Sequence, residues 1–397
     1  MIELINWILE EGRDGDDLGA ILAGLSERLV ARGVPLCRTT LLVPTLDPTT
    51  AVISYLWWRD KGLTSAEISR EDAYGAAFQR SPVHYLLEHN IGGERWPLED
   101  PAVAERFVLF QELRALGVTE YVLQFVPFSR GRIALRGAAL SMATDRGGGF
   151  VAADMETVSH ILPALSLVAY RIGLSRFAAE ALGAYLGPQT GERVLQGMIQ
   201  RGQSQTISAA LLLADLRGFT ALADRAPAAA VVGWLNDHLE CIGDAVVEHG
   251  GEVLKFLGDG LLAVFPAASS GADRACRAAV EAALDAGARN DALNRRRFDV
   301  GAPALDLSIA LHFGDVAYGN IGTARRLDFT VIGPAVNEVS RMEALGKQLG
   351  HALLLSESIA HRCDRAVANL GPHALRGVAD TREVFVLVGE RQGCGGA

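Results

Sequence analysis

The segment VLKFLGDGLLAVF, residues 253–265, constrains the fold most, because two strand-length apolar runs flank a Gly-Asp-Gly sequence. Glycine and aspartate suit the positive φ angles of a tight turn, so the segment predicts two antiparallel strands joined by a hairpin. Asp259 is expected at the turn. Lys255 is expected within the first strand, on the face shared by Val253 and Leu257. A turn aspartate and a snorkelling lysine on a sheet edge would explain this hairpin equally well.

The rest of the C-terminal half predicts an α/β domain around this hairpin. A buried strand is predicted over 207–215, a helix from Pro227, an alanine-rich helix over 272–288 and a strand over 305–314. This order of strand, helix, two strands, helix and strand is typical of a ferredoxin-like βαββαβ layout. Further elements are a Gly-rich segment after residue 314, a strand over 329–333, a helix from Pro334, and a strand, helix and strand within 353–388.

The N-terminal half reads as a second α/β domain with a different order of elements. A helix is predicted over 16–33, strands over 37–44 and 50–58, helical stretches over 71–90 and 104–116, strands over 121–128 and 132–144, and a long helix from Val151. This layout resembles a GAF-type sensor domain. The long helix carries apolar residues at helical spacing, which fits either packing on its own sheet or pairing with its copy in a dimer. RGQSQ, residues 201–205, is expected to be the linker into the second domain.

Bulk properties restrict the class of protein and its partners. A chain of 397 residues is long enough for two domains. Its net charge of −10 argues against a broad nucleic-acid surface, which needs a basic face. The five cysteines are scattered and the N-terminus lacks a basic signal-peptide region, so a cytoplasmic protein is expected. The longest uncharged apolar run, near 157–170, is too short to predict a membrane span.

Two aspartates suggest a metal site. Asp215 ends the buried strand in LLLADLRGFT, and Asp259 could lie beside it if the two strands are neighbours. Converging carboxylates repel each other unless a divalent cation lies between them. A pair of Mg²⁺ ions could then hold both the attacking and the leaving oxygen of a phosphoryl transfer. Alternatively, Asp215 only caps a helix.

Asn337 and Arg341 lie four residues apart on the helix that Pro334 begins, and therefore on one face. Arginine offers a planar fork for phosphate oxygens, and asparagine can hydrogen-bond to a sugar or a reacting oxygen. Such a pair is also common on a solvated helix face, so by itself it does not identify a site.

Three motifs together resemble the catalytic domain of class III nucleotide cyclases. These are DLRGFT, KFLGDG and FTVIGPAVNEVSRME, in this order and spacing, and the resemblance covers about residues 207–388. Together with the GAF-like layout of the N-terminal half, it predicts a GAF-like sensory domain over 1–150, a helical signalling linker over 151–205, a cyclase catalytic domain over 206–390 and a flexible tail over 391–397.

The resemblance also implies roles for individual residues. Asp215, Asp259 and Leu216 would form the site of two Mg²⁺ or Mn²⁺ ions. Asn337 would orient the ribose or the transition state, and Arg341 would bind phosphate and stabilise the charge that develops there.

Three further residues would bind the substrate. Lys255 and Thr330 would read the purine base, and Arg376 would be an additional phosphate contact. A lysine donates to an acceptor such as adenine N1, and a threonine hydroxyl can accept from the exocyclic amine, so this pair favours ATP over GTP. The Lys/Thr pair resembles a subgroup with bicarbonate-responsive members, which makes bicarbonate a candidate activator at the catalytic domain.

The resemblance places each active site between two catalytic domains, so a homodimer with two equivalent sites is expected. The N-terminal domain would either respond to a small-molecule regulator that the sequence does not identify or only mediate dimerisation. The leading interpretation is an adenylate cyclase. A guanylate cyclase and a non-catalytic, nucleotide-binding signalling protein are the alternatives.

Overall fold

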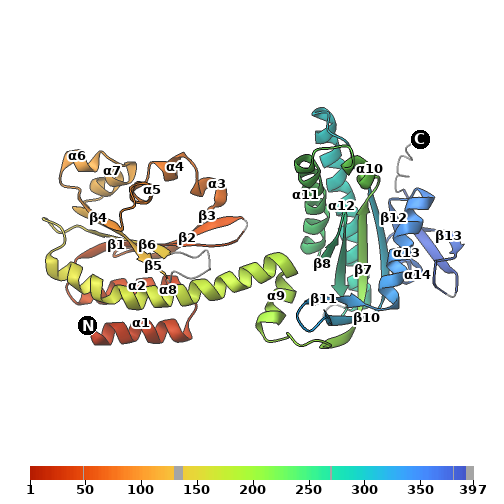
Figure 1. The fold of residues 1–397 in the computed structure, drawn as a ribbon, viewed down its shortest axis with the longest axis horizontal. Coiled ribbons are helices and arrows are strands. Elements are labelled where there is room, and N and C mark those ends of the chain that lie inside the picture. The colour runs from red at the N-terminus through yellow and green to blue at the C-terminus, as the bar shows by residue number, and fades with distance from the viewer. Residues whose placement is uncertain (48, 129–136, 269–270, 379, 390–397) are drawn as a thin grey trace. The chain divides into compact units, whose positions relative to one another are not determined.

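The computed structural model describes residues 1–47, 49–128, 137–268, 271–378 and 380–389 (Figure 1). Contacts divide the chain into two compact units, residues 1–184 and 185–397. The predicted tail over 391–397 and the first residues of the predicted strand over 132–144 lie outside the described residues.

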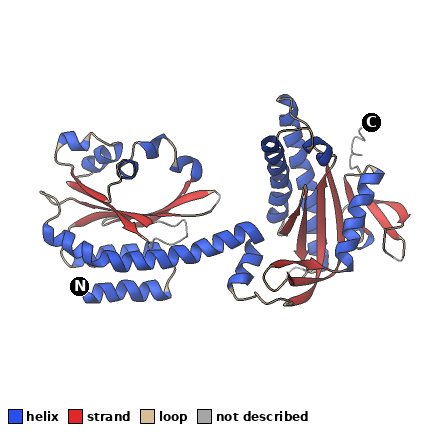
Figure 2. Cartoon of the chain, in the orientation of Figure 1, coloured by secondary structure: helices blue, strands red, loops and turns tan. Residues whose placement is uncertain are grey.

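The N-terminal unit is built on a six-stranded antiparallel sheet of order β3-β2-β1-β6-β5-β4 (Figure 2). The strands predicted near 37–44, 50–58 and 121–128 are confirmed. Two strands were not predicted, because β3 is almost wholly exposed and β4 buries only Trp96. The strands are β1 (Leu36–Pro44), β2 (Thr50–Trp58), β3 (Gly62–Ser69), β4 (Gly93–Pro97), β5 (Glu120–Pro127) and β6 (Gly137–Thr144).

Helices cover both faces of this sheet. One face packs against α1 (Ile2–Asp14), α2 (Leu18–Ala31) and α8 (Ala152–Leu186). The other face packs against α5 and α7, with Trp96 and Phe110 in its core. The helical stretches predicted over 71–90 are observed as short separate helices, because Gly75 and the Ser81-Pro82 cap interrupt the chain between them. The short helices are α3 (Arg70–Ala73), α4 (Ala76–Gln79), α5 (Pro82–Glu88), α6 (Pro101–Ala104) and α7 (Val108–Ala115).

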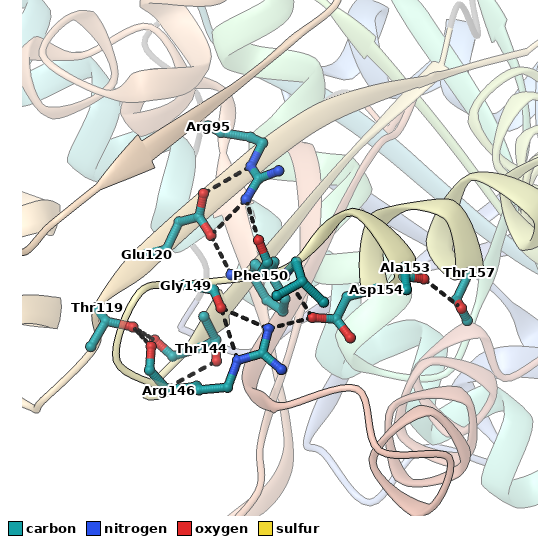
Figure 3. A network of polar contacts seen from close by, with 11 residues as sticks. Arg95, Thr119, Glu120, Thr144, Arg146, Gly149, Phe150, Ala153, Asp154 and Thr157 are labelled. Carbon is teal, nitrogen blue, oxygen red and sulfur yellow. Dashed lines mark hydrogen bonds and ion pairs between the residues drawn. The ribbon is translucent and has the colours of Figure 1, made fainter.

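A polar network fixes the start of α8 to strands β4 and β5 (Figure 3). Arg95 donates to both carboxylate oxygens of Glu120, at 2.8 and 3.0 Å, and to the carbonyl oxygen of Phe150 at 2.7 Å. Asp154 accepts from Arg146 at 2.5 Å and from the Val151 amide at 2.9 Å. The second bond satisfies one of the free amides at the helix N-terminus, so the network both caps and positions the helix.

The first two-thirds of α8 pack on the sheet of their own unit, through Val158, Ile161, Leu165, Val168 and Ile172. Pairing with a second copy stays a prediction. Within the part of the chain that the structure describes, α8 is the one helix long and apolar enough to cross a membrane, and 44% of its apolar window is buried. Core helices of soluble proteins meet the same criterion, so length and composition do not distinguish a membrane-spanning helix from a core helix.

The C-terminal unit contains an eight-stranded sheet of order β13-β14-β12-β10-β7-β9-β8, with β11 paired to β10. Strands β10 and β12 are parallel, and the other pairs are antiparallel. The predicted order of strand, helix, two strands, helix and strand is observed from β7 to β10. The strands are β7 (Ser204–Leu216), β8 (Glu252–Leu257), β9 (Gly260–Pro266), β10 (Leu307–Gly322), β11 (Leu327–Ile332), β12 (Leu353–Ser356), β13 (Val367–His373) and β14 (Arg382–Leu387).

Two hydrophobic cores cover the two faces of this sheet. The long helices α11 and α12 pack on one face, and α13 packs on the other. Asp215 alternates with Ala214 and Leu216 of the first core, so it points to the α13 side. The helices are α9 (Pro188–Leu195), α10 (Phe219–Ala223), α11 (Ala228–Glu248), α12 (Ala272–Asp299), α13 (Pro334–Leu349) and α14 (Glu357–Ala360).

Two segments predicted as irregular are strands. The Gly-rich segment after residue 314 continues β10 to Gly322, and β7 begins at Ser204, inside the predicted linker 201–205. The glycine serves close packing here, because a Cβ added at Gly319 would lie 2.5 Å from the Ser204 Cα. Glycine in a strand can mark such a close approach of backbones, and a sequence pattern does not separate it from a loop glycine.

The predicted hairpin is confirmed. Lys255 shares a face with Leu257, as predicted, but not with Val253. The register of β8 and β9 shifts between Val253 and Lys255, so Val253 lies opposite Ala263 while Lys255 lies opposite Leu262. Opposed residues share a face, and Ala263 and Leu262 belong to different cores. A β-bulge therefore turns Lys255 to the face opposite that of Val253, toward the core that α13 covers.

Candidate active site

Asp215 and Asp259 meet at one edge of the sheet. Asp215 lies near the end of β7, and Asp259 lies in the turn between β8 and β9. The turn approaches β7 closely, because a Cβ at Gly260 would lie 2.3 Å from the carbonyl oxygen of Ala214. Both aspartates line a pocket of about 340 Å³ whose other lining residues are Leu216, Arg217, Gly218, Phe219, Thr220 and Lys347.

The electrostatics of this pocket favour a cation. Burial and the adjacent Asp215 carboxylate raise the pKa of Asp259. Oδ1 of Asp215 is buried and has no hydrogen-bond partner. An uncompensated buried carboxylate oxygen is costly, and a divalent cation between the two side chains would relieve both the burial and the repulsion.

The donor set fits Mg²⁺ or Mn²⁺ in part. Within the described ranges, no group of three or more His, Cys, Asp or Glu side chains is placed to hold a metal ion. Mg²⁺ typically takes one or two carboxylates and completes its shell with water and substrate phosphates. Two aspartates beside Leu216 therefore suit a metal site whose remaining ligands come from water or from a bound phosphate group.

Sequence reasoning missed Lys347, which lines this pocket, and Glu343, which pairs with Lys347. The ammonium of Lys347, on α13, lies 2.9 Å from Asp215 Oδ2 and 3.2 Å from Glu343 Oε1. Glu343 is 6% exposed, and this burial raises its pKa. One signal was available, because the two residues are four apart, a spacing that pairs opposite charges on a helix.

The predicted base-reading residues lie on β8 and β11. Lys255 Nζ lies 3.4 Å from Oδ2 of Asp328, two residues before Thr330 on the same strand. Thr330 is buried, and its hydroxyl has no hydrogen-bond partner. Sequence reasoning missed Asp328, although its position one strand repeat from Thr330 could have indicated it.

Asn337, Arg341 and Arg376 do not line the pocket of the two aspartates. Asn337 and Arg341 are exposed on the first half of α13, and Arg376 is exposed between β13 and β14. Among the residues that the structure describes, no side-chain hydrogen bond or ion pair to these three is found. The structure thus brings Asp215, Asp259 and Leu216 together and leaves the other three facing solvent.

Residues 202–389 match the family model of the adenylate and guanylate cyclase catalytic domain. This segment is therefore a cyclase catalytic domain. The family includes both adenylate and guanylate cyclases, so the match does not separate the two activities. The match confirms that the three sequence motifs belong to a class III cyclase catalytic domain.

Individual relatives match over the same half of the chain. The adenylate cyclase of Anabaena cylindrica is 34% identical over 186 residues, which are 46% of this chain and 35% of that protein. Adenylate cyclase 1 of Rhizobium meliloti is 27% identical over 183 residues, 45% of this chain and 27% of that protein. The chain thus spans about a third of the length of these curated relatives.

A solved structure is also similar. The adenylyl cyclase CyaB from P. aeruginosa is 26% identical with a TM-score of 0.44, and the match covers 49% of this chain and 100% of that one.

Proposed function

We propose that the chain is an adenylate cyclase that converts ATP to 3′,5′-cyclic AMP and pyrophosphate. The observation that carries the proposal is the convergence of Asp215 and Asp259, with the pKa of Asp259 raised by burial and by its neighbour. The family match of residues 202–389 and the names of the two curated relatives support it. Guanylate cyclase is the alternative within the same domain family.

Base selection would rest on Lys255 and Thr330. The ammonium of Lys255 has three donors, so it can keep Asp328 and still donate to adenine N1. The unpartnered hydroxyl of Thr330 could accept from the exocyclic amine. Guanine presents a donor at N1, which the donor-only Lys255 does not match, whereas the Thr330 hydroxyl can turn to donate to guanine O6. Discrimination against GTP would therefore rest mainly on Lys255.

The reaction joins the ribose 3′-oxygen to the α-phosphorus, breaks the bond to the leaving pyrophosphate, and passes the hydroxyl proton to water or a substrate phosphate. Metal ions bound at Asp215, Asp259 and Leu216 would supply a lowered pKa of the 3′-hydroxyl and neutralise phosphate charge. Arg341 would bind the α-phosphate as charge spreads over it, and Asn337 would orient the ribose. Arg376 would hold a terminal phosphate.

A homodimer would complete the site. Asn337 and Arg341 are exposed and lie outside the pocket of the two aspartates, which suits residues that serve the pocket of a second copy. Each of the two equivalent sites would then combine Asp215 and Asp259 of one copy with Asn337 and Arg341 of the other. The N-terminal unit would act as a GAF-like sensor for a small molecule, and bicarbonate is a candidate activator of the catalytic domain.

The test is production of cyclic nucleotide by the purified full chain with ATP or GTP, in Mg²⁺ or Mn²⁺. Asp259→Asn keeps the shape of the side chain and removes its charge, and it should abolish turnover. Asp364→Asn removes a comparable carboxylate from a surface ion pair with Arg277, and it should leave turnover unchanged.

Three outcomes are informative. Cyclic AMP from wild type and from Asp364→Asn, but not from Asp259→Asn, would support the proposal. Cyclic GMP as the main product would replace it with the guanylate alternative. A folded wild type that binds ATP and forms no product with either metal, with or without bicarbonate, would overturn it.

A further inference from the structure

Two carboxylates and one ammonium line the proposed metal pocket, and the ammonium also pairs with a third carboxylate outside the lining. Lys347 contacts Asp215 at 2.9 Å and Glu343 at 3.2 Å, and its charge also lowers the pKa of Asp259 against the larger raising effects. Ser308 lies opposite Asp215 in the β7–β10 register and beside Glu343, which closes the sheet side of this cluster. The side chain of Lys347 is 35% exposed, so it is partly accessible to solvent.

The Lys347 ammonium binds an oxygen of Asp215 that a metal ion would otherwise coordinate. Oδ2 of Asp215 accepts from Lys347, whereas Oδ1 is enclosed without a partner. A divalent cation shared by Asp215 and Asp259 must therefore either displace Lys347 from Oδ2 or bind while repelled by a positive charge a few ångströms away. Both routes weaken binding of the free ion.

A lysine at position 347 is suited to reversible pairing with the carboxylates. Only three of the 37 Lys and Arg residues are lysines, at positions 61, 255 and 347. Lysine carries a compact point charge on a flexible stem, whereas arginine presents a rigid planar fork. A point charge can take the place of a metal ion between carboxylates and can leave again by rotation of the stem.

We propose that Lys347 is a tethered counter-cation that holds the carboxylates of Asp215 and Glu343 together and competes with the divalent metal ion for Asp215. The free domain then binds metal weakly, and the ion is taken up mainly with the triphosphate, whose oxygens offset the repulsion. This inference rests on the proposed metal site but concerns how that site is filled. Lys347 is a positioning residue in this scheme, since it acts on the metal ligands.

The experiment measures Mn²⁺ binding to the full chain without nucleotide, by the loss of the free-ion electron paramagnetic resonance signal. Lys347→Met keeps the stem and removes the charge, and Mn²⁺ should bind about tenfold more tightly. Lys61→Met removes a lysine from the β2–β3 turn of the N-terminal unit and should bind as wild type does. Asp259→Asn in the Lys347→Met background should abolish the gain, which locates the ion at this pocket.

Thermal unfolding gives a second readout. In EDTA, Lys347→Met should melt below wild type, because the carboxylates repel without their counter-charge. In Mn²⁺ its melting temperature should rise more than that of wild type, because the stabilisation by a ligand increases with the logarithm of its affinity. Lys347→Gln serves in the same way if the methionine variant fails to fold.

The outcomes separate this inference from the cyclase proposal. A folded Lys347→Met that binds Mn²⁺ no more tightly than wild type would overturn the tethered counter-cation, even if wild type makes cyclic AMP. Tighter Mn²⁺ binding that depends on Asp259 would support it, even if no cyclic nucleotide is formed from ATP or GTP.

Discussion

Lys255 of β8 and Asp328 of β11 form an ion pair with 3.4 Å between Nζ and Oδ2, and the buried Thr330 follows Asp328 by two residues on the same strand. The pair joins two strands that are separated in the sheet and limits the rotamers of the flexible lysine. An exposed ion pair of this kind contributes only about 0–1 kcal/mol to stability. Its larger effect is expected on the direction in which Lys255 points.

Asp328→Asn should therefore raise the KM for ATP by roughly three- to tenfold and leave kcat within about twofold, because the lysine must be ordered on binding. Steady-state kinetics of cyclic AMP formation measure both constants. Asp364→Asn, a surface carboxylate far along the chain, is the control. A lower kcat at an unchanged KM would contradict a positioning role for Asp328.

Lys255→Glu should reverse the hydrogen-bonding character at the base. A carboxylate accepts where the lysine donates, so adenine N1 loses its donor and guanine N1 gains an acceptor. The ratio of GTP to ATP turnover should rise by about tenfold or more. Lys61→Glu makes the same charge change in the N-terminal unit and should leave the ratio unchanged. An equal fall for both nucleotides would show that Lys255 does not read the base.

The hairpin of β8 and β9 shows which structural features can be predicted from the sequence and which cannot. Its apolar runs and its Gly-Asp-Gly turn depend on local residues, so the two strands and the place of Asp259 were predictable. The bulge that turns Lys255 to the opposite face depends on the register with β9, which local alternation does not contain.

The same distinction applies within the pocket. Asp215 and Asp259 belong to motifs that are continuous in sequence, and they were predicted. Lys347 and Asp328 become part of the site only because α13 and β11 fold back onto the strands that carry Asp215 and Lys255. The spacing of Glu343 and Lys347 on one helix, and of Asp328 and Thr330 on one strand, gives a local signal. The contacts of Lys347 and Asp328 with other elements have no such pattern in the sequence.

Glu252 should prove important for stability, because it joins three segments of the C-terminal unit. The buried carboxylate accepts from the Thr190 amide at 3.0 Å, from the Thr190 hydroxyl at 2.8 Å and from the Tyr318 hydroxyl at 2.6 Å. Glu252→Gln puts an amide NH₂ group, which donates, where one acceptor oxygen stood. It should lower the free energy of unfolding by about 2–3 kcal/mol.

Thermal unfolding and hydrogen exchange of β8 would measure this loss, with Glu281→Gln, a surface partner of Arg365, as the control. Thr190→Val should lose one of the three bonds and Tyr318→Phe another, each about 1 kcal/mol and less than Glu252→Gln. A Glu252→Gln protein as stable as Glu281→Gln would show that the buried carboxylate is not required.

His238 should make the C-terminal unit sensitive to acid. The side chain is fully buried on α11, its Nδ1 pairs with Asn290, and burial lowers its pKa, with the nearby Arg297 acting in the same direction. The folded pKa thus lies below the unfolded value of about 6.5, so the unfolded chain takes up the proton first as the pH falls. The contribution of His238 to stability is complete above the unfolded pKa and is lost as the pH falls below it.

The free energy of unfolding should accordingly decrease from pH 7.5 to 5.5, with a slope from this group of at most about 1.4 kcal/mol per pH unit. Pulse proteolysis in urea, read on gels that separate fragments of the two units, would follow the C-terminal unit alone. His238→Gln can keep a hydrogen bond to Asn290 but does not titrate, so its slope should be smaller than that of wild type. His361→Gln changes an exposed histidine of the same unit and should retain the wild-type slope. Equal slopes for His238→Gln and wild type would mean that the acid sensitivity comes from other groups.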